Sequence, residues 1–254
     1  MWSFDAVADA IAAELELRDR ALRDEQAVRG LDSLDELQLH PIAEKALNSA
    51  GFGVLREQPY PHEWRRKIRP GTSAGEDAAA LPEHRDRRRC DFVLTEHPGQ
   101  KLDDAWSNER SERTRRKQLR GTLFEDAAVS PSTQESAAVN PEDVLWLECK
   151  LVTQFDCASG AAGPNRSYAS QIVRGPVTDL VKLADDPQIM HAGIVLVVFT
   201  QDAVVAEHDL TTLAHKCLDR DLPLLAPVRR TLSIPDRMGN GVCSVWVLGM
   251  RKAV

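Results

Sequence analysis

Two charged residues stand two positions apart in an otherwise apolar run, VLWLECKLV at residues 144–152. In a β-strand, residues i and i+2 project to the same face, so Glu148 and Lys150 share one face with Trp146. The opposite face carries only apolar side chains and predicts a core-facing surface. Burying charge costs free energy. The pattern therefore indicates a functional site, with a buried ion pair or a solvated strand face as the alternatives.

A third residue that can do chemistry, Asp91, lies in the segment RCDFVLTE at residues 89–96, which also has the pattern of a strand. The alternation of this strand predicts Cys90 and Phe92 on one side and Asp91 on the other. Hydrolysis of a phosphodiester needs a divalent cation held by oxygen ligands, which carboxylates supply. If the two strands are adjacent, Asp91 and Glu148 can bind one Mg²⁺ together.

Lys150 completes this set, because its ammonium group lies on the same predicted strand face as Glu148. A lysine beside a metal and carboxylates can stabilise an attacking water or help to deprotonate it. The three side chains together predict metal-assisted hydrolysis of a phosphodiester.

Two helices are expected before these strands. Residues 3–27 carry apolar side chains at three- and four-residue spacing, which predicts an amphipathic helix that packs on the domain or mediates dimerisation. Residues 33–50 predict a second helix, with Ser33 as N-cap and Glu36 as its capping-box partner. Pro41 is expected to kink this helix or to restart it at residue 41.

Alternating or continuous apolar runs predict the remaining elements. Strands are expected at 52–60, 89–96, 144–152, 191–200, 227–234 and 241–250, and helices at 167–185, interrupted by Gly175-Pro176, and at 207–219. Polar segments at 61–88 and 97–142 predict loop insertions. The order α, α, β, β, β, α, β, α, β, β favours one α/β domain with a mixed sheet.

The composition limits the partners that the chain can have. Its 254 residues carry a formal net charge of −7, which excludes a uniformly basic surface. A nucleic acid would have to meet a local basic patch. Three stretches offer one: RRKIR at 65–69, HRDRRR at 84–89 and RTRRKQLR at 113–120.

Cysteine and histidine spacing gives no support for a zinc site or a disulfide framework. None of the five cysteines forms a CxxC pair, and the seven histidines are interpreted as structural or surface residues. No apolar stretch approaches the roughly 20 residues that span a bilayer. A cytoplasmic location without membrane contact is therefore expected.

The order α-β-β-β-α-β over residues 40–200, with an acid in one strand and Glu-x-Lys in the next, resembles the PD-(D/E)xK superfamily of restriction-endonuclease-like nucleases. The resemblance implies a restriction-endonuclease-like αβββαβ core at 37–200, after an N-terminal helix at 1–36. A C-terminal αββ extension of the same domain is expected at 201–254. Two features depart from the family pattern: Cys90 stands in place of the proline, and 56 residues separate Asp91 from Glu148.

The resemblance implies Mg²⁺ or Mn²⁺ bound by Asp91, Glu148 and the backbone carbonyl of Cys149. It also implies two further catalytic residues: Glu44 from the first core helix and Gln171 from the helix that follows the Glu-x-Lys strand. An exposed surface position, which Lys45 beside it suggests, is the alternative for Glu44.

Three other residues near that second helix are candidate substrate contacts. Tyr168 and Arg174 lie on the same predicted helix face as Gln171, and Arg166 precedes the helix, where backbone N–H groups favour anions. An ordinary polar helix face is the alternative.

The resulting hypothesis is a metal-dependent nuclease that hydrolyses DNA with a water activated between Mg²⁺ and Lys150. DNA as the substrate, and a homodimer that cuts both strands, are implied by the resemblance. A non-catalytic module that binds nucleic acid or a protein through the same fold is the alternative, since a fold does not fix a function. A third reading is an ordinary α/β scaffold in which Asp91 lies far from Glu148.

Overall fold

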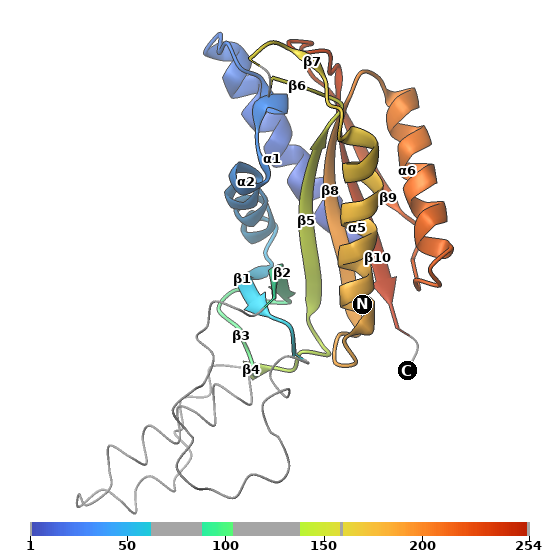
Figure 1. The fold of residues 1–254 in the computed structure, drawn as a ribbon. Coiled ribbons are helices and arrows are strands. Elements are labelled where there is room, and N and C mark those ends of the chain that lie inside the picture. Colours follow the sequence, from blue (N-terminus) through green and yellow to red (C-terminus); the bar gives the residue numbers. More distant parts are fainter. Residues whose placement is uncertain (1, 62–87, 104–137, 158–159, 253–254) are drawn as a thin grey trace, which may run out of the picture.

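The computed structural model describes residues 2–61, 88–103, 138–157 and 160–252. These residues form a six-stranded mixed sheet with helices on both faces, as Figure 1 shows. The predicted α/β class and mixed sheet are thus confirmed. The basic stretches at 65–69 and 113–120, and most of the one at 84–89, lie outside the described residues, as does most of each predicted insertion.

The elements follow the expected order along the chain. The sheet contains β1 (Gly53–Pro59), β2 (Arg89–Thr95), β5 (Leu145–Thr153), β8 (His191–Thr200), β9 (Val228–Ser233) and β10 (Val242–Arg251). The helices are α1 (Phe4–Asp24), α2 (Glu36–Ser49), α5 (Tyr168–Asp185) and α6 (Ala203–Leu218), with a short 3₁₀ turn, η1 (Leu31–Ser33), before α2. Two small ladders, which the sequence did not predict, pair β3 (Lys101–Leu102) with β4 (Ala138–Val139) and β6 (Phe155–Asp156) with β7 (Gly163–Pro164).

The strand order in the large sheet is β1-β2-β5-β8-β10-β9. β1 pairs with β2, and β2 with β5, in antiparallel fashion, whereas β5 pairs with β8 in parallel. A parallel neighbour requires a crossover connection, which α5 supplies. β10 and β9 then continue the sheet beyond β8 with antiparallel pairing, so the C-terminal αββ segment extends the same sheet.

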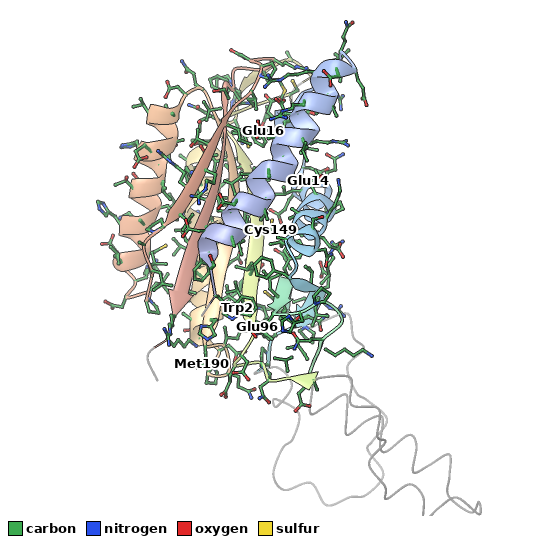
Figure 2. The ribbon with its side chains drawn as sticks, turned by 180° about the vertical axis from the view of Figure 1, so that it is seen from behind. Trp2, Glu14, Glu16, Glu96, Cys149 and Met190 are labelled. Atoms are coloured by element: carbon green, nitrogen blue, oxygen red, sulfur yellow. The ribbon has the colours of Figure 1, made fainter. Side chains whose placement is uncertain are left out.

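The two faces of the sheet bury different helices. One core cluster joins α1 and α2 to Leu145, Leu147 and Cys149 of β5, and the other joins α5 and α6 to Trp146 and Val152 of the same strand. Figure 2 shows Cys149 on the face that α1 and α2 cover. The predicted alternation of β5 is therefore confirmed. It directs Glu148 and Lys150 to the side of α5.

The apolar stripe of α1 packs on the sheet, which is the first of the two roles that the sequence allowed. Val7, Ile11 and Leu15 are fully buried in the cluster with β10. Gly249 of β10 permits this close approach, because a Cβ atom there would lie 2.5 Å from the ring of Phe4. Among the described residues, no helix is long and apolar enough to cross a membrane.

The start of α2 differs from the prediction. The helix begins at Glu36 with Asp35 as N-cap, and Asp35 and Gln38 form the reciprocal capping box. Ser33 belongs to η1 instead, where its hydroxyl donates to the carbonyl of Gly30. α2 continues through Pro41, so a restart at residue 41 is wrong, and α5 likewise continues through Pro176.

Removal of the Asp35 cap should destabilise the protein more than removal of the Ser33 hydroxyl. Asp35→Ala leaves the backbone N–H of Gln38 without its acceptor, at an expected cost of about 1 kcal/mol in the free energy of unfolding. Ser33→Ala should cost less, since it removes one hydroxyl from a turn. Urea denaturation of both variants measures the difference, and the reverse ranking would contradict the cap at Asp35.

Candidate metal centre and active site

Asp91 lies where the ladders of β2 are interrupted on both sides. On one side, the pairing of β1 with β2 runs through Arg56–Phe92 and Gln58–Cys90 but omits Glu57 and Asp91. Glu57 has a positive φ of 53°, which is rare for a residue with a Cβ atom and marks a local distortion. On the other side, the ladder with β5 ends at Phe92 and its partner Leu147.

The side chain of Asp91 takes the place of a backbone acceptor at this point. Its Oδ2 accepts a hydrogen bond of 2.8 Å from the backbone N–H of Cys149. Cys90 packs with the α5–α6 core, while Phe92 packs with the α1–α2 core, so the prediction that both share one side is wrong. The physical reason is the interruption: the alternation of β2 changes phase at Asp91, and Cys90 Sγ donates to the carbonyl of Leu147.

Glu148 lies beside Asp91 and is 5% exposed. The Tyr60 hydroxyl, itself buried, donates a hydrogen bond to Glu148 Oε1. Burial, with the charge of Asp91 and a hydrogen bond to it, raises the pKa of Glu148 to about 8. The structure thus brings the two predicted carboxylates into contact, and the reading that keeps them far apart is wrong.

Lys150 is surrounded by acids. Its Nζ lies 3.1 Å from Glu36 Oε1 and 3.5 Å from Asp179 Oδ2. Burial alone would lower the pKa of Lys150, but the charges of Asp179 and Glu36 outweigh it and hold the pKa above its ordinary value. Lys150 is therefore a protonated cation at neutral pH, which suits the stabilisation of negative charge and not the removal of a proton from water.

Two further side chains, His40 and Glu57, gather around Asp91. Ligand atoms of His40, Glu57 and Asp91 all lie within 4.8 Å of one another. His40 is 3% exposed, and its Nε2 has no hydrogen-bond partner among the described residues. This nitrogen lies 3.9 Å from Asp91 Oδ2. The interpretation of the histidines as structural or surface residues is therefore incomplete, because His40 belongs to a cluster with metal-ligand chemistry.

These residues fit a divalent cation on three grounds. Two carboxylates in contact, with Glu57 near Asp91, repel one another when all are ionised, and either a proton on Glu148 or a cation relieves this repulsion. The buried His40 Nε2 is a donor or acceptor without a partner, which is costly to leave unused. Carboxylate oxygens and an imidazole nitrogen are ligands that divalent metal ions accept in proteins. Asp91 is the residue that all these contacts share.

Glu44 lies one helical turn after His40 on α2. Its Oε2 is 3.4 Å from an Arg56 nitrogen, and the side chain is 35% exposed. His40, and not Glu44, is the α2 residue in the cluster with Asp91. Cys149 contributes its backbone N–H to Asp91, and its thiol is fully buried on the α1–α2 face.

The predicted residues of α5 lie in its first half, before Asp179, which is the α5 residue near Lys150. Gln171 accepts a hydrogen bond from Asn165, which also donates to the Thr153 carbonyl at the end of β5. The Tyr168 hydroxyl donates to Asp209 of α6 at 2.6 Å. Arg166 and Arg174 are exposed to solvent. The α5 residue that contacts Lys150 is Asp179.

Five residues that the sequence did not predict for the candidate site therefore surround it: Asp179, Tyr60, His40, Glu57 and Glu36, the last of which was expected only as a capping-box partner. Asp179 had a readable signal, because helical spacing places it in the apolar stripe with Pro176 and Leu183, where an acid must find a partner. Tyr60, His40 and Glu57 had none, since strand pairing and the packing of α2 bring them to Asp91.

Comparison with known proteins identifies no relative. No protein-family model, no curated protein and no solved structure matches the chain. The function must therefore be argued from the geometry of Asp91, Glu148 and Lys150 and their neighbours.

Proposed function

We propose that the chain is a metal-dependent phosphodiesterase, a nuclease of the PD-(D/E)xK type that acts on DNA. The observation that carries this proposal is the contact between Asp91 of β2 and Glu148 of β5, with Lys150 two residues further along β5. A buried acid, a half-buried acid and a lysine from adjacent strands are the set that the resemblance implies.

The connectivity supports the same proposal. The order α2, β1, β2, β5, α5, β8 agrees with the α-β-β-β-α-β order of the superfamily. We propose that these elements form a restriction-endonuclease-like core, with α1 before it and α6, β9 and β10 after it. The choice of DNA as the substrate rests on the resemblance.

The residues that would hold the cation are Asp91 and Glu148, with His40 and Glu57 beside them. When bound, a divalent cation would supply Lewis-acid charge to polarise the phosphodiester and lower the pKa of the attacking water. The imidazole of His40 favours Mn²⁺ over Mg²⁺, because Mg²⁺ prefers oxygen ligands. The backbone carbonyl of Cys149 is the further ligand that the resemblance implies.

The chain's own groups prepare the site for a phosphate. Lys150 supplies a fixed positive charge between α5 and the start of α2, where Asp179 of α5 and Glu36 of α2 orient its ammonium group. The Tyr60 hydroxyl holds Glu148 Oε1, which leaves the second carboxylate oxygen for the cation or Asp91. The Cys149 N–H fixes one oxygen of Asp91 in the same way.

Cleavage of plasmid and linear DNA tests this proposal. The wild-type protein should cleave with Mn²⁺ or Mg²⁺ and not with EDTA. Lys150→Met should slow cleavage by on the order of 10²-fold, because it removes the positive charge that stabilises the transition state. The fold should persist in this variant, since Asp179 keeps its 2.5 Å contact with Lys182.

Lys45→Met is the matched control, because Lys45 lies on α2 and pairs with Glu14 at the protein surface. It should cleave at the wild-type rate. Equal cleavage by Lys150→Met and wild type would refute the assigned role of Lys150. A wild-type protein that binds DNA but cuts under no cation would favour the non-catalytic binding module instead.

A further inference from the structure

A groove between α5 and the end of α6 gathers positive charge on this acidic chain. It encloses about 460 Å³ and is lined by five basic side chains: Arg88, Arg174, Lys182, Lys216 and Arg220. Asp185 is the acidic residue of the same lining. A net charge of −7 over the chain makes this local excess notable, since a polyanion can bind such a protein only at a basic patch.

Three of these five cations are available to a ligand. Lys182 pairs with Asp179 and Lys216 with Asp219. Arg88, Arg174 and Arg220 form no ion pair with any residue that the structure describes, and all three are exposed. Arginine presents several donors in a planar fork that matches phosphate geometry.

The groove adjoins the candidate site at two points. Asp179 contacts Lys182 in the groove wall with one oxygen and lies 3.5 Å from Lys150 with the other. The carbonyl of Arg88 accepts from the backbone N–H of Tyr60, whose hydroxyl contacts Glu148. A nucleic-acid strand that extends from the site on the side of α5 would therefore enter the groove.

The dimensions favour an extended anion over a single phosphate. Arg174 and Lys182 are eight residues apart on α5, which separates them by about 12 Å along the helix axis at 1.5 Å per residue. This length exceeds a single phosphate group and can span neighbouring phosphates of one strand. Val173, Val177 and Val181 form an apolar wall that sugars and bases can contact.

We infer that the α5–α6 groove binds the phosphate backbone of a single nucleic-acid strand and directs that strand into the site of Asp91, Glu148 and Lys150. This inference rests on the proposed function and adds to it the path of the substrate. The volume of about 460 Å³ lies in the range of clefts that hold one small ligand, which suits the backbone of one strand.

Fluorescence anisotropy with a labelled single-stranded oligonucleotide in EDTA tests binding without cleavage. The double variant Arg174→Glu with Arg220→Glu should bind at least about tenfold more weakly at physiological salt, because two phosphate contacts become repulsive. Arg18→Glu with Arg29→Glu is the control, with the same charge change on exposed residues on and just after α1. The control should change affinity less than about twofold, since screening weakens distant charges.

A second measurement separates direct contacts from total charge. Arg174→Ala with Arg220→Ala should reduce the slope of log affinity against log salt concentration by about 1.4, which corresponds to two lost phosphate contacts. Equal weakening by the groove and control variants, an unchanged slope, or a mononucleotide affinity equal to that of the oligonucleotide would overturn the inference. So would a wild-type protein that does not bind the oligonucleotide.

The outcomes also distinguish this inference from the nuclease proposal. If wild type cleaves DNA and the groove variants bind normally, the groove inference is wrong and the nuclease proposal stands. If the groove variants alone lose binding and wild type fails to cleave DNA with every cation tested, the groove inference stands and the nuclease proposal is wrong.

Discussion

Asp91→Asn should reduce cation-dependent DNA cleavage on the order of 10²- to 10³-fold and leave the fold intact. Asp91 is the residue that the His40–Glu57 group and Glu148 have in common, so its charge matters to every candidate ligand arrangement. Asparagine keeps an oxygen that can accept from the Cys149 N–H, so the hydrogen bond to β5 should survive. The variant thus removes the charge of residue 91 while it keeps the side chain in its position.

Two measurements check this expectation. Cleavage rates with Mn²⁺ give the catalytic effect, and calorimetric titration with Mn²⁺ gives the loss of cation affinity. Asp24→Asn is the matched control, because Asp24 is an exposed residue at the end of α1. Wild-type cleavage or wild-type Mn²⁺ affinity in Asp91→Asn would be incompatible with a metal site at this residue.

Glu148→Gln should stabilise the cation-free protein while it abolishes cleavage. Burial of Glu148 and its contact with Asp91 disfavour the ionised form. Glutamine removes that charge, can still accept from Tyr60 and can donate an N–H to Asp91. The free energy of unfolding in EDTA at pH 8 should rise by about 1 to 3 kcal/mol.

The pH dependence of the free energy of unfolding follows from the direction in which folding shifts the pKa of Glu148. The pKa of Glu148 is raised in the folded protein, from its ordinary value of 4.5 to about 8. The folded state then holds a proton that the unfolded state releases, so wild-type stability falls as the pH rises between these values. The advantage of Glu148→Gln should therefore be near zero at about pH 4 and reach its full size near pH 8.

Urea denaturation across this pH range measures the effect, with and without Mn²⁺. Glu16→Gln, on the exposed face of α1, is the control and should change stability by less than about 0.5 kcal/mol. Mn²⁺ should stabilise wild type more than Glu148→Gln, because the variant lacks one carboxylate ligand. A Glu148→Gln protein that is less stable than wild type at pH 8 in EDTA would contradict the inferred cost of this buried acid.

The sequence predicts those elements whose pattern is continuous and whose neighbours are apolar. β8 runs from 191 to 200 as expected, and β5 keeps its alternation along its whole length. β2 does not, because the Asp91 side chain replaces a backbone acceptor of a partner strand, and such a contact has no periodicity in the chain. Asp35, and not the predicted Ser33, is the N-cap of α2, because Ser33 belongs to η1.

The residues of the candidate site likewise fall into two groups: those that the sequence pattern reveals and those that only the fold brings together. Asp91, Glu148 and Lys150 could be found because charges stand out in apolar strands. His40 was hidden because a lone histidine in a helix carries no ligand spacing. Glu57 reaches Asp91 only through the register of β1 with β2, and Tyr60 reaches Glu148 from the end of that strand. Contacts made by folding two distant strands together leave no trace in local sequence.

The hydrogen bond from Cys149 to Asp91 also bears on how the chain can change in length. Three residue pairs, Phe92–Leu147, Val93–Trp146 and Leu94–Leu145, already align β2 with β5, and Asp91 is tied to β5 directly. The separation of the two carboxylates is thus set locally by these pairs and does not depend on residues 96–144, which join the two strands. During evolution this connection can become longer or shorter, or acquire an inserted domain, without changing the separation of the two carboxylates.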